Sequence, residues 1–241
     1  MSVFDFILSP KEKVLLEDIV LEDSIRDAII QLIKEHKHIE QLKKYNLPVN
    51  NKILLYGNSG CGKTMTAAAI ANALDKNIYI INLSTIINSR IGETSLNIKQ
   101  LFDKAAKEQA VLFLDEFDHI AKARGNDERD VGEMRRLVNT LIQLIDYFPE
   151  KALLICATNH AEIIDSAIIR RFQQRIHYTL PSEQILNQYY DKILSNLPNE
   201  LKAINRVYNI SYAEAKDLAL TQVKRNLLNK LEENTSTSNA G

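Results

Sequence analysis

The chain lacks the features that mark several classes of protein. Its 241 residues include only two cysteines, too few for a disulfide framework, which fits a reducing compartment. No segment approaches the roughly 18 consecutive apolar residues of a membrane-spanning helix. The apolar start MSVFDFILSP has no basic leader and no small-residue cleavage pattern. We therefore expect a cytoplasmic protein without a membrane segment.

The chain also has little excess charge and no common zinc motif. Lys and Arg number 30 and Asp and Glu 31, which gives a net charge of −1. Nucleic-acid-binding domains are usually markedly basic, so this balance argues against one, although a local basic pore is compatible with it. The zinc-protease pattern HExxH is absent. His36 and His38 lack ligand-like neighbours, and we place both on the solvent side of a helix.

The most informative stretch is residues 52–66, KILLYGNSGCGKTMT, where an apolar strand meets an alanine-rich helix through a glycine loop. Gly57-x-x-x-x-Gly62-Lys63-Thr64 fits the phosphate-loop pattern. Glycines let successive backbone N–H groups wrap a phosphate chain, and the helix N-terminus favours the same anion. Lys63 would neutralise the β- and γ-phosphates, and the Thr64 hydroxyl would hold magnesium. The stretch predicts a site for a nucleoside triphosphate and Mg²⁺.

An acidic pair follows another apolar strand. Val111–Leu114 ends in Asp115 and Glu116. Ligands of open α/β sheets bind at the carboxyl ends of the strands, so this pair should stand beside the phosphate loop. Asp115 would position magnesium, usually through a water, and Glu116 would polarise the attacking water. The alternative is an acidic helix start after a buried strand. The preceding phosphate loop favours the functional interpretation over this alternative.

Two further positions carry candidate functional groups. Asn159 follows a strand and could orient water between Glu116 and the γ-phosphate, although alone it is only a turn former. Arg170 and Arg171 follow a short helix, whose end favours cations for purely electrostatic reasons. The functional alternative is an arginine finger, which stabilises the charge of phosphoryl transfer and can be supplied in trans by another subunit.

Strands alternate with helices, which predicts a five-stranded parallel sheet between helices, the α/β fold of P-loop NTPases, followed by a small helical lid. We expect an N-terminal arm and helix at 1–45 and the nucleotide-binding core at 46–181. The lid is expected at 182–233. The polar segment 234–241 has nothing to bury, so we expect it to be disordered.

In order, the motifs GxxxxGKT, LDE, TN and DSAIIRRF resemble those of the AAA subfamily of AAA+ ATPases. The likeness runs from about Asp18 to Leu228. It is strongest to katanin- and spastin-like disassembly ATPases and to the ATPase module of membrane-anchored bacterial AAA proteases. The resemblance implies Mg²⁺-dependent ATP hydrolysis in a homo-oligomeric ring, expected to be a hexamer.

The resemblance also assigns roles by position. It makes Asp115 and Glu116 the Walker B pair, Asn159 sensor one, and Arg170 and Arg171 fingers that reach the ATP of the next subunit. The nucleotide-binding loop and the residue after it are Gly57, Asn58, Ser59, Gly60, Cys61, Gly62, Lys63, Thr64 and Met65. The adenine-recognition segment and the lid turn near the base and ribose are Ile19, Val20, Tyr212 and Ala213.

Three departures from the family pattern are visible. The Walker A glycines are kept, but the loop reads GNSGCG instead of GPPGTG, and Cys61 either faces the nucleotide or packs into the core. Tyr212 stands where a glycine is usual. In the pore-loop segment 89–92, Arg90 takes the usual aromatic position. Arg90 would favour an acidic substrate, a nucleic-acid strand or no threading at all.

Three functions follow from these features. The favoured one is a ring ATPase that remodels or regulates a protein partner, which includes a protease supplied in trans. The second is a nucleotide-controlled assembly switch that threads no polymer, which Arg90 favours. The third is a nucleic-acid translocase, against which the near-neutral charge argues.

Overall fold

A computed structural model describes residues 4, 7, 13–87, 91–119 and 128–238 of the chain. These residues form two compact units. The first unit comprises Met1–Ile19, Asp23–Gly57 and Gly62–Tyr178. The second comprises Val20–Glu22, Asn58–Cys61 and Thr179–Gly241. The phosphate loop therefore divides between the units, with its ends in the first and its middle in the second.

The first unit is built on one parallel sheet with the strand order β2-β3-β4-β1-β5. Every neighbouring pair runs parallel. The strands are β1 (Lys52–Gly57), β2 (Ile78–Asn82), β3 (Val111–Asp115), β4 (Leu153–Thr158) and β5 (Gln174–Tyr178). The predicted five-stranded parallel α/β sheet is confirmed.

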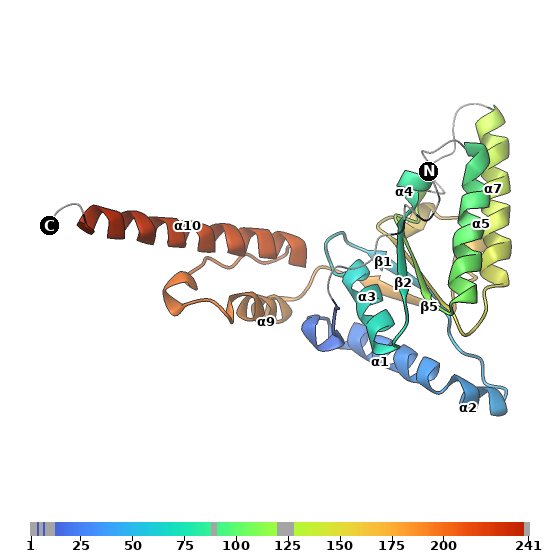
Figure 1. Ribbon diagram of the computed structural model, residues 1–241, viewed down its shortest axis with the longest axis horizontal. Coiled ribbons are helices and arrows are strands. Elements are labelled where there is room, and N and C mark those ends of the chain that lie inside the picture. Colours follow the sequence, from blue (N-terminus) through green and yellow to red (C-terminus); the bar gives the residue numbers. More distant parts are fainter. Residues whose placement is uncertain (1–3, 5–6, 8–12, 88–90, 120–127, 239–241) are drawn as a thin grey trace. The chain divides into compact units, whose positions relative to one another are not determined.

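Helices cover both faces of this sheet. Figure 1 shows the strands between α5 and α7 on one side and α1 and α3 on the other. The longer helices are α1 (Asp23–Lys37), α3 (Lys63–Ala73), α5 (Ile91–Lys107) and α7 (Glu128–Asp146). The shorter ones are η2 (Leu16–Asp18), α2 (Ile39–Lys44), α4 (Leu83–Ile87), η3 (Ala161–Ile163) and α8 (Ser166–Ile169).

The core follows from the alternation of side chains along each strand. Leu54, Leu112 and Leu154 belong to a buried cluster with apolar residues of α5 and α7. Their neighbours in sequence, such as Ile53, point to the opposite face and are also buried. β1, β3 and β4 contain runs of buried residues and read as continuous apolar segments in the sequence. Buried residues alternate with more exposed ones along β2 and β5.

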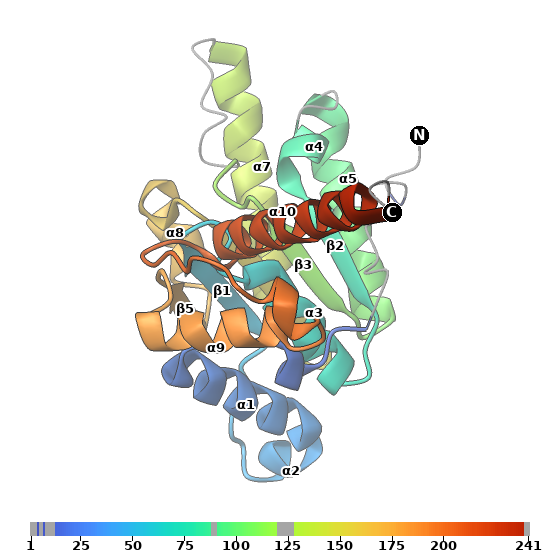
Figure 2. The ribbon, with the colours of Figure 1, turned by 90° about the vertical axis from the view of Figure 1, so that its left-hand side faces the viewer.

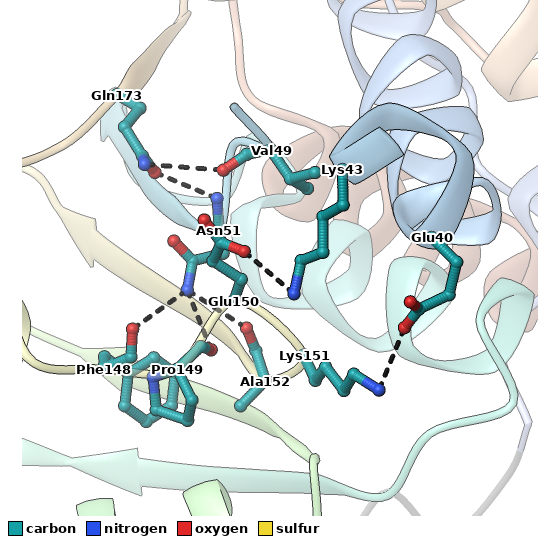
Figure 3. A network of polar contacts seen from close by, with 10 residues as sticks. All are labelled: Glu40, Lys43, Val49, Asn51, Phe148, Pro149, Glu150, Lys151, Ala152 and Gln173. Atoms are coloured by element: carbon teal, nitrogen blue, oxygen red, sulfur yellow. Dashed lines mark hydrogen bonds and ion pairs between the residues drawn. The ribbon is translucent and has the colours of Figure 1, made fainter. Parts of the chain in front are cut away.

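Side chains hold together the amino ends of β1, β4 and β5 (Figure 3). The Asn51 side chain is buried, and its Nδ2 donates to three carbonyl oxygens before and at the start of β4, at 3.0–3.4 Å. These oxygens belong to Phe148, Pro149 and Ala152. Gln173 Oε1 accepts hydrogen bonds from the N–H groups of Asn51 and Lys52, both at 2.9 Å. The buried Asn51 amide is thus paired with protein acceptors, as buried polar groups usually are.

A lysine extends this arrangement to β2 and β3. Lys76 precedes β2, and its Nζ donates to Gln109 O at 2.7 Å and to Lys151 O, just before β3 and β4. Burial lowers the pKa of Lys76. Ion pairs Lys43–Glu150 at 3.1 Å and Lys151–Glu40 at 2.9 Å add contacts from α2. Such exposed pairs contribute only about 0–1 kcal/mol.

His36 is a correction to the sequence analysis. It is buried on α1, and its Nε2 lies 2.9 Å from Asn50 O. It follows Ile29, Leu32 and Ile33 at helical spacing, so it shares their inward face. Burial lowers the pKa of His36, with the Asn50 carbonyl acting in the opposite direction.

The second unit is helical, as expected for a lid. Its elements are α9 (Glu183–Leu194), η4 (Asn199–Leu201) and α10 (Tyr212–Ser238). Figure 2 shows α10 beside α9, and a small core joins them through Leu186, Tyr190 and Ala215. Helix α10 continues to Ser238, into the segment 234–241 for which we predicted disorder. A helix can extend past its packed turns because each added residue forms another backbone hydrogen bond. None of the described helices has the length and apolar character needed to cross a membrane.

Candidate nucleotide site

Two glycines shape the ends of the phosphate loop in the first unit. Gly57 has φ +124° and Gly62 has φ +95°, conformations that side-chain-bearing residues rarely adopt. A Cβ at Gly57 would lie 2.0 Å from Tyr178 O, so no other residue fits where β1 ends against β5. Gly62 is the N-cap of α3, which begins at Lys63 and presents its N-terminus at this point.

Lys63 links the phosphate loop to the end of β4. Its side chain is buried, and its Nζ donates to Gly57 O and to Asn159 Oδ1, both at 2.8 Å. Asn159 itself is exposed immediately after β4. The structure therefore brings together two residues that are 96 positions apart and that the sequence analysis assigned to one site.

Thr64 and Asp115 join the loop to the end of β3. Thr64 Oγ1 donates to Asp115 Oδ2 at 3.1 Å, and Asp115 Oδ1 accepts from Glu116 N at 2.9 Å. A hydroxyl and a carboxylate are the hard oxygen donors that magnesium takes. Among the described residues, no group of three or more His, Cys, Asp or Glu could hold a metal alone. The pair fits magnesium that arrives with nucleotide phosphates, because Mg²⁺ commonly uses one or two carboxylates plus phosphate oxygens.

Glu116 has an unusual backbone. Its φ is +53°, in the left-handed region that few residues other than glycine occupy. The next residue, Phe117, donates its N–H to Ala157 O at 2.9 Å, which holds the chain against β4 after the turn. The Glu116 carboxylate is partly exposed, with Oε2 3.5 Å from His119 Nε2. Strained backbones of this kind occur often at functional sites.

A contact that the sequence analysis missed lies between the turns after β3 and β4. Asp118 is buried, and its Oδ1 accepts a hydrogen bond from Thr158 Oγ1 at 2.9 Å. The same hydroxyl accepts from His160 N at 2.9 Å. The sequence carried one signal of this contact: the acidic residue Asp118 directly follows Phe117. The Phe117 side chain is fully buried.

The two neighbouring arginines have different surroundings. Both precede β5, a strand at the edge of the sheet. Arg170 is the exposed C-cap of α8. The Arg171 side chain is only 20% exposed, and its Nε lies 2.9 Å from Asp146 Oδ1. Next in the chain, Phe172 packs edge-on against Phe117, with ring centroids 5.8 Å apart. This aromatic contact joins the arginine segment to the turn that carries Glu116.

The second unit contains the middle of the phosphate loop and the lid turn, which touch. Gly60 has φ +71°, and a Cβ there would lie 2.7 Å from Ser211 Oγ. Ala213 N donates to Gly60 O at 3.2 Å. The Tyr212 ring is buried against Tyr189, with centroids 4.9 Å apart. The tyrosine that replaces the usual glycine is therefore part of the lid core.

The other loop residues have simpler environments. Asn58 and Ser59 are exposed, whereas Cys61 is buried and its Sγ donates to Ser59 O at 3.6 Å. Burial of this thiol agrees with the alternative in which Cys61 packs into the protein. Met65 is 50% exposed on α3.

The predicted roles of two segments, in adenine recognition and in a pore, stay predictions. Ile19 belongs to the first unit, where its carbonyl accepts from Arg26 Nη2 at 2.8 Å, and Val20 belongs to the second. Their contact with adenine stays a prediction. Arg90 lies outside the described residues, and so does its predicted role in a pore.

The fold is that of a P-loop NTPase, and comparison with known proteins identifies its family. Residues 53–180 match the model of the "ATPase family associated with various cellular activities (AAA)". The chain therefore belongs to the AAA family.

Two curated relatives agree with this assignment. An uncharacterized AAA family ATPase, y4kL of Sinorhizobium fredii, is 35% identical over 181 residues, which are 75% of this chain and 54% of that protein. A putative cell division cycle ATPase of Plasmodium falciparum is 34% identical over 184 residues, 74% of this chain and 15% of that protein. The chain thus spans about half of the first relative and a small part of the second.

Proposed function

We propose that the chain binds ATP with Mg²⁺, assembles into a hexameric ring and uses ATP hydrolysis to remodel or regulate a protein partner. The observation that carries the proposal is the meeting of three segments at the carboxyl end of the sheet. Lys63 contacts Asn159 after β4, and Thr64 contacts Asp115 at the end of β3. Parallel sheets bind ligands at this end.

Each residue has a distinct chemical role in this proposal. The Lys63 ammonium binds the β- and γ-phosphates, and the Thr64 hydroxyl and Asp115 carboxylate would hold Mg²⁺, Asp115 through a water. Bound Mg²⁺ supplies charge neutralisation at the phosphate oxygens. Glu116 orients a water and accepts its proton as the water oxygen attacks the γ-phosphorus. The bond to the bridging oxygen then breaks, which leaves ADP and phosphate. Asn159 orients the same water without adding charge.

The arginines support hydrolysis at the interface between subunits. Arg170 is exposed beside an edge strand, where a neighbouring subunit could place its nucleotide. Arg171 would act as a second finger only by exchanging its ion pair with Asp146 for the phosphate of that nucleotide. Arginine is suited to this exchange because its planar group binds carboxylate and phosphate in the same bidentate way.

The partner is proposed to be a protein, which includes a protease supplied in trans, because the net charge of −1 does not favour nucleic acid. A second candidate is an assembly switch that threads no polymer, and the arginine at position 90 of the sequence favours it. Stimulation of ATP turnover separates the functions: stimulation by proteins or peptides indicates remodelling, by DNA or RNA translocation, and by neither a switch.

A mixing experiment tests the ring and the trans arginines together. The Arg170→Ala/Arg171→Ala double variant has an intact nucleotide site, and Lys63→Ala has intact arginines. Each should be inactive alone, because trans arginine fingers contribute roughly 10³–10⁵ in rate. Mixed in equal amounts, the two variants should recover part of the wild-type phosphate release.

The control is light scattering and cross-linking of differently tagged subunits, which shows that mixed oligomers form. Wild-type activity per subunit should also rise with protein concentration as rings assemble. A mixture that forms mixed oligomers and stays as inactive as its components contradicts the trans assignment.

A further inference from the structure

We infer that Asp118 is a positioning residue that acts through the Thr158 hydroxyl to hold Asn159 against Lys63. The inference rests on the proposed function, in which Asn159 is the sensor of the γ-phosphate. It adds two buried residues whose role is to set the geometry of Asn159.

The hydrogen bonds around Thr158 have a defined direction. A hydroxyl has one proton, and the Asp118 carboxylate, 2.9 Å away, can only accept it when ionised. A lone pair of Thr158 Oγ1 is then directed at His160 N, also 2.9 Å away. Thr158 and His160 flank Asn159 in the chain. One hydroxyl therefore fixes the backbone on both sides of Asn159.

The position of Asn159 matters because of its contact with the phosphate-loop lysine. Asn159 Oδ1 lies 2.8 Å from Lys63 Nζ, so a small shift of the turn after β4 would lengthen this bond. Burial makes the contact specific: the exposed fraction is 3% for Asp118 and 1% for Thr158. Charged hydrogen bonds shielded from water are stronger and more directional than exposed ones.

The same contact joins two catalytic turns. Asp118 lies two residues after Glu116, and the N–H of Phe117 donates to Ala157 O at 2.9 Å. The turn that carries Glu116 and the turn that carries Asn159 are therefore linked by two hydrogen bonds. One is this backbone bond, and the other is the side-chain bond between Thr158 and Asp118. Water orientation by Glu116 and Asn159 requires that these two turns keep a fixed separation.

The test is a double-mutant cycle on ATP turnover at a concentration where activity per subunit no longer rises. Thr158→Val keeps the side-chain shape and removes the hydroxyl, and Thr158→Ser restores the hydroxyl as the matched control. Thr158→Val should lower kcat roughly tenfold, within the range of coupling between contacting residues. The dissociation constant of a fluorescent ATP analogue should change little, and Thr158→Ser should stay close to wild type.

The decisive arm repeats Thr158→Val in the Asn159→Ala background. If Thr158 acts through Asn159, it should cause no further loss of kcat there, while the loss of thermal stability should be the same in both backgrounds. An equal fold-loss of kcat in both backgrounds, or no loss in the wild-type background, overturns the inference. Wild-type turnover by Asn159→Ala alone instead overturns the sensor role within the proposed function.

If Thr158→Val does not fold, Asp118→Asn replaces it in the same cycle. This change keeps the shape and removes the charge that sets the direction of the hydroxyl proton. The same two outcomes then apply: loss of kcat that vanishes with Asn159→Ala supports the inference, and loss that persists contradicts it.

Discussion

The two ends of the parallel sheet contain similar polar residues but use them in different ways. At the amino end, Asn51 and Lys76 donate to backbone carbonyls that precede neighbouring strands. At the carboxyl end, Lys63 and Thr64 contact side chains of the proposed ATP site, Asn159 and Asp115. The two side chains at the amino end are thus bonded to backbone carbonyls. Those at the carboxyl end are bonded to other side chains, and they could bind a ligand instead.

Positive φ values occur at both ends of the sheet. At the carboxyl end they belong to Gly57, Gly62 and Glu116, and at the amino end to Asp75 and Gln109, which precede β2 and β3. For a non-glycine residue this conformation costs of order 1–3 kcal/mol, and it persists only where surrounding contacts enforce it. The two ends therefore differ in the partners of their polar side chains and not in backbone strain.

The largest expected difference is between two lysines, one at each end. Lys63→Met should abolish ATP binding, because the phosphates would then face backbone dipoles alone. Lys76→Met should keep ATP binding and lower stability, since it removes the hydrogen bonds to Gln109 O and Lys151 O. Calorimetric ATP titration and chemical denaturation of both variants measure the two effects. Loss of ATP binding by folded Lys76→Met would contradict the division between the ends.

Asn51→Ala should have the next largest effect. It removes the buried hydrogen bonds to Phe148 O and Ala152 O, which should cost roughly 3 kcal/mol of the free energy of unfolding. The neighbour Asn50 is the control, because its side-chain amide donates to the partly exposed Glu35 carboxylate at 3.1 Å and Asn50→Ala should cost less. Denaturant midpoints measure both. Turnover per folded molecule should be unchanged in Asn51→Ala, and a selective loss of turnover would refute the assignment.

His36 should give the smallest effect, as a dependence of stability on pH. Burial lowers its pKa from 6.5, and Lys76 adds to this, while Asn50 and Glu35 oppose it. The unfolded chain therefore binds the proton more readily than the folded chain. Stability present above pH 6.5 should be lost progressively as the pH falls below that value.

His36→Gln keeps a hydrogen-bond donor and cannot gain the charge, so its stability should change less between pH 7 and pH 5. The effect should be a fraction of that of Asn51→Ala, and denaturation at several pH values measures it. Glu40 and Glu214 have lowered pKa values, so they titrate below this window. If the stability of the variant and of the wild type changed equally with pH, groups other than His36 would cause the dependence.

Much of the fold, and the segments that contain the contacting pairs Lys63–Asn159 and Thr64–Asp115, could be derived from the sequence because their signals are local. A glycine loop between an apolar strand and a helix, and acidic residues at a strand end, are contiguous in the chain. The Asp118–Thr158 contact was missed because it depends on how two side chains meet across neighbouring strands, 40 positions apart. No local sequence pattern predicts such a contact.

The placement of His36 on the solvent side was wrong. His36 shares helical spacing with Ile29 and Ile33, so its inward position was present in the sequence, but the polarity of the side chain suggested exposure. Disorder of the polar tail stays a prediction, and the helix α10 runs to Ser238. The different environments of Arg170 and Arg171 depend on Asp146, which belongs to a distant helix.

The most direct test of the account is ATP binding and hydrolysis by Glu116→Gln. This substitution keeps the size of the side chain and removes the group that accepts the proton of water. Removal of such a group should lower turnover by roughly 10²–10⁴-fold. The protein should bind ATP with the affinity of the wild type and have the same denaturation midpoint. Wild-type phosphate release by purified Glu116→Gln would contradict the assignment of chemistry to the carboxyl end of the sheet.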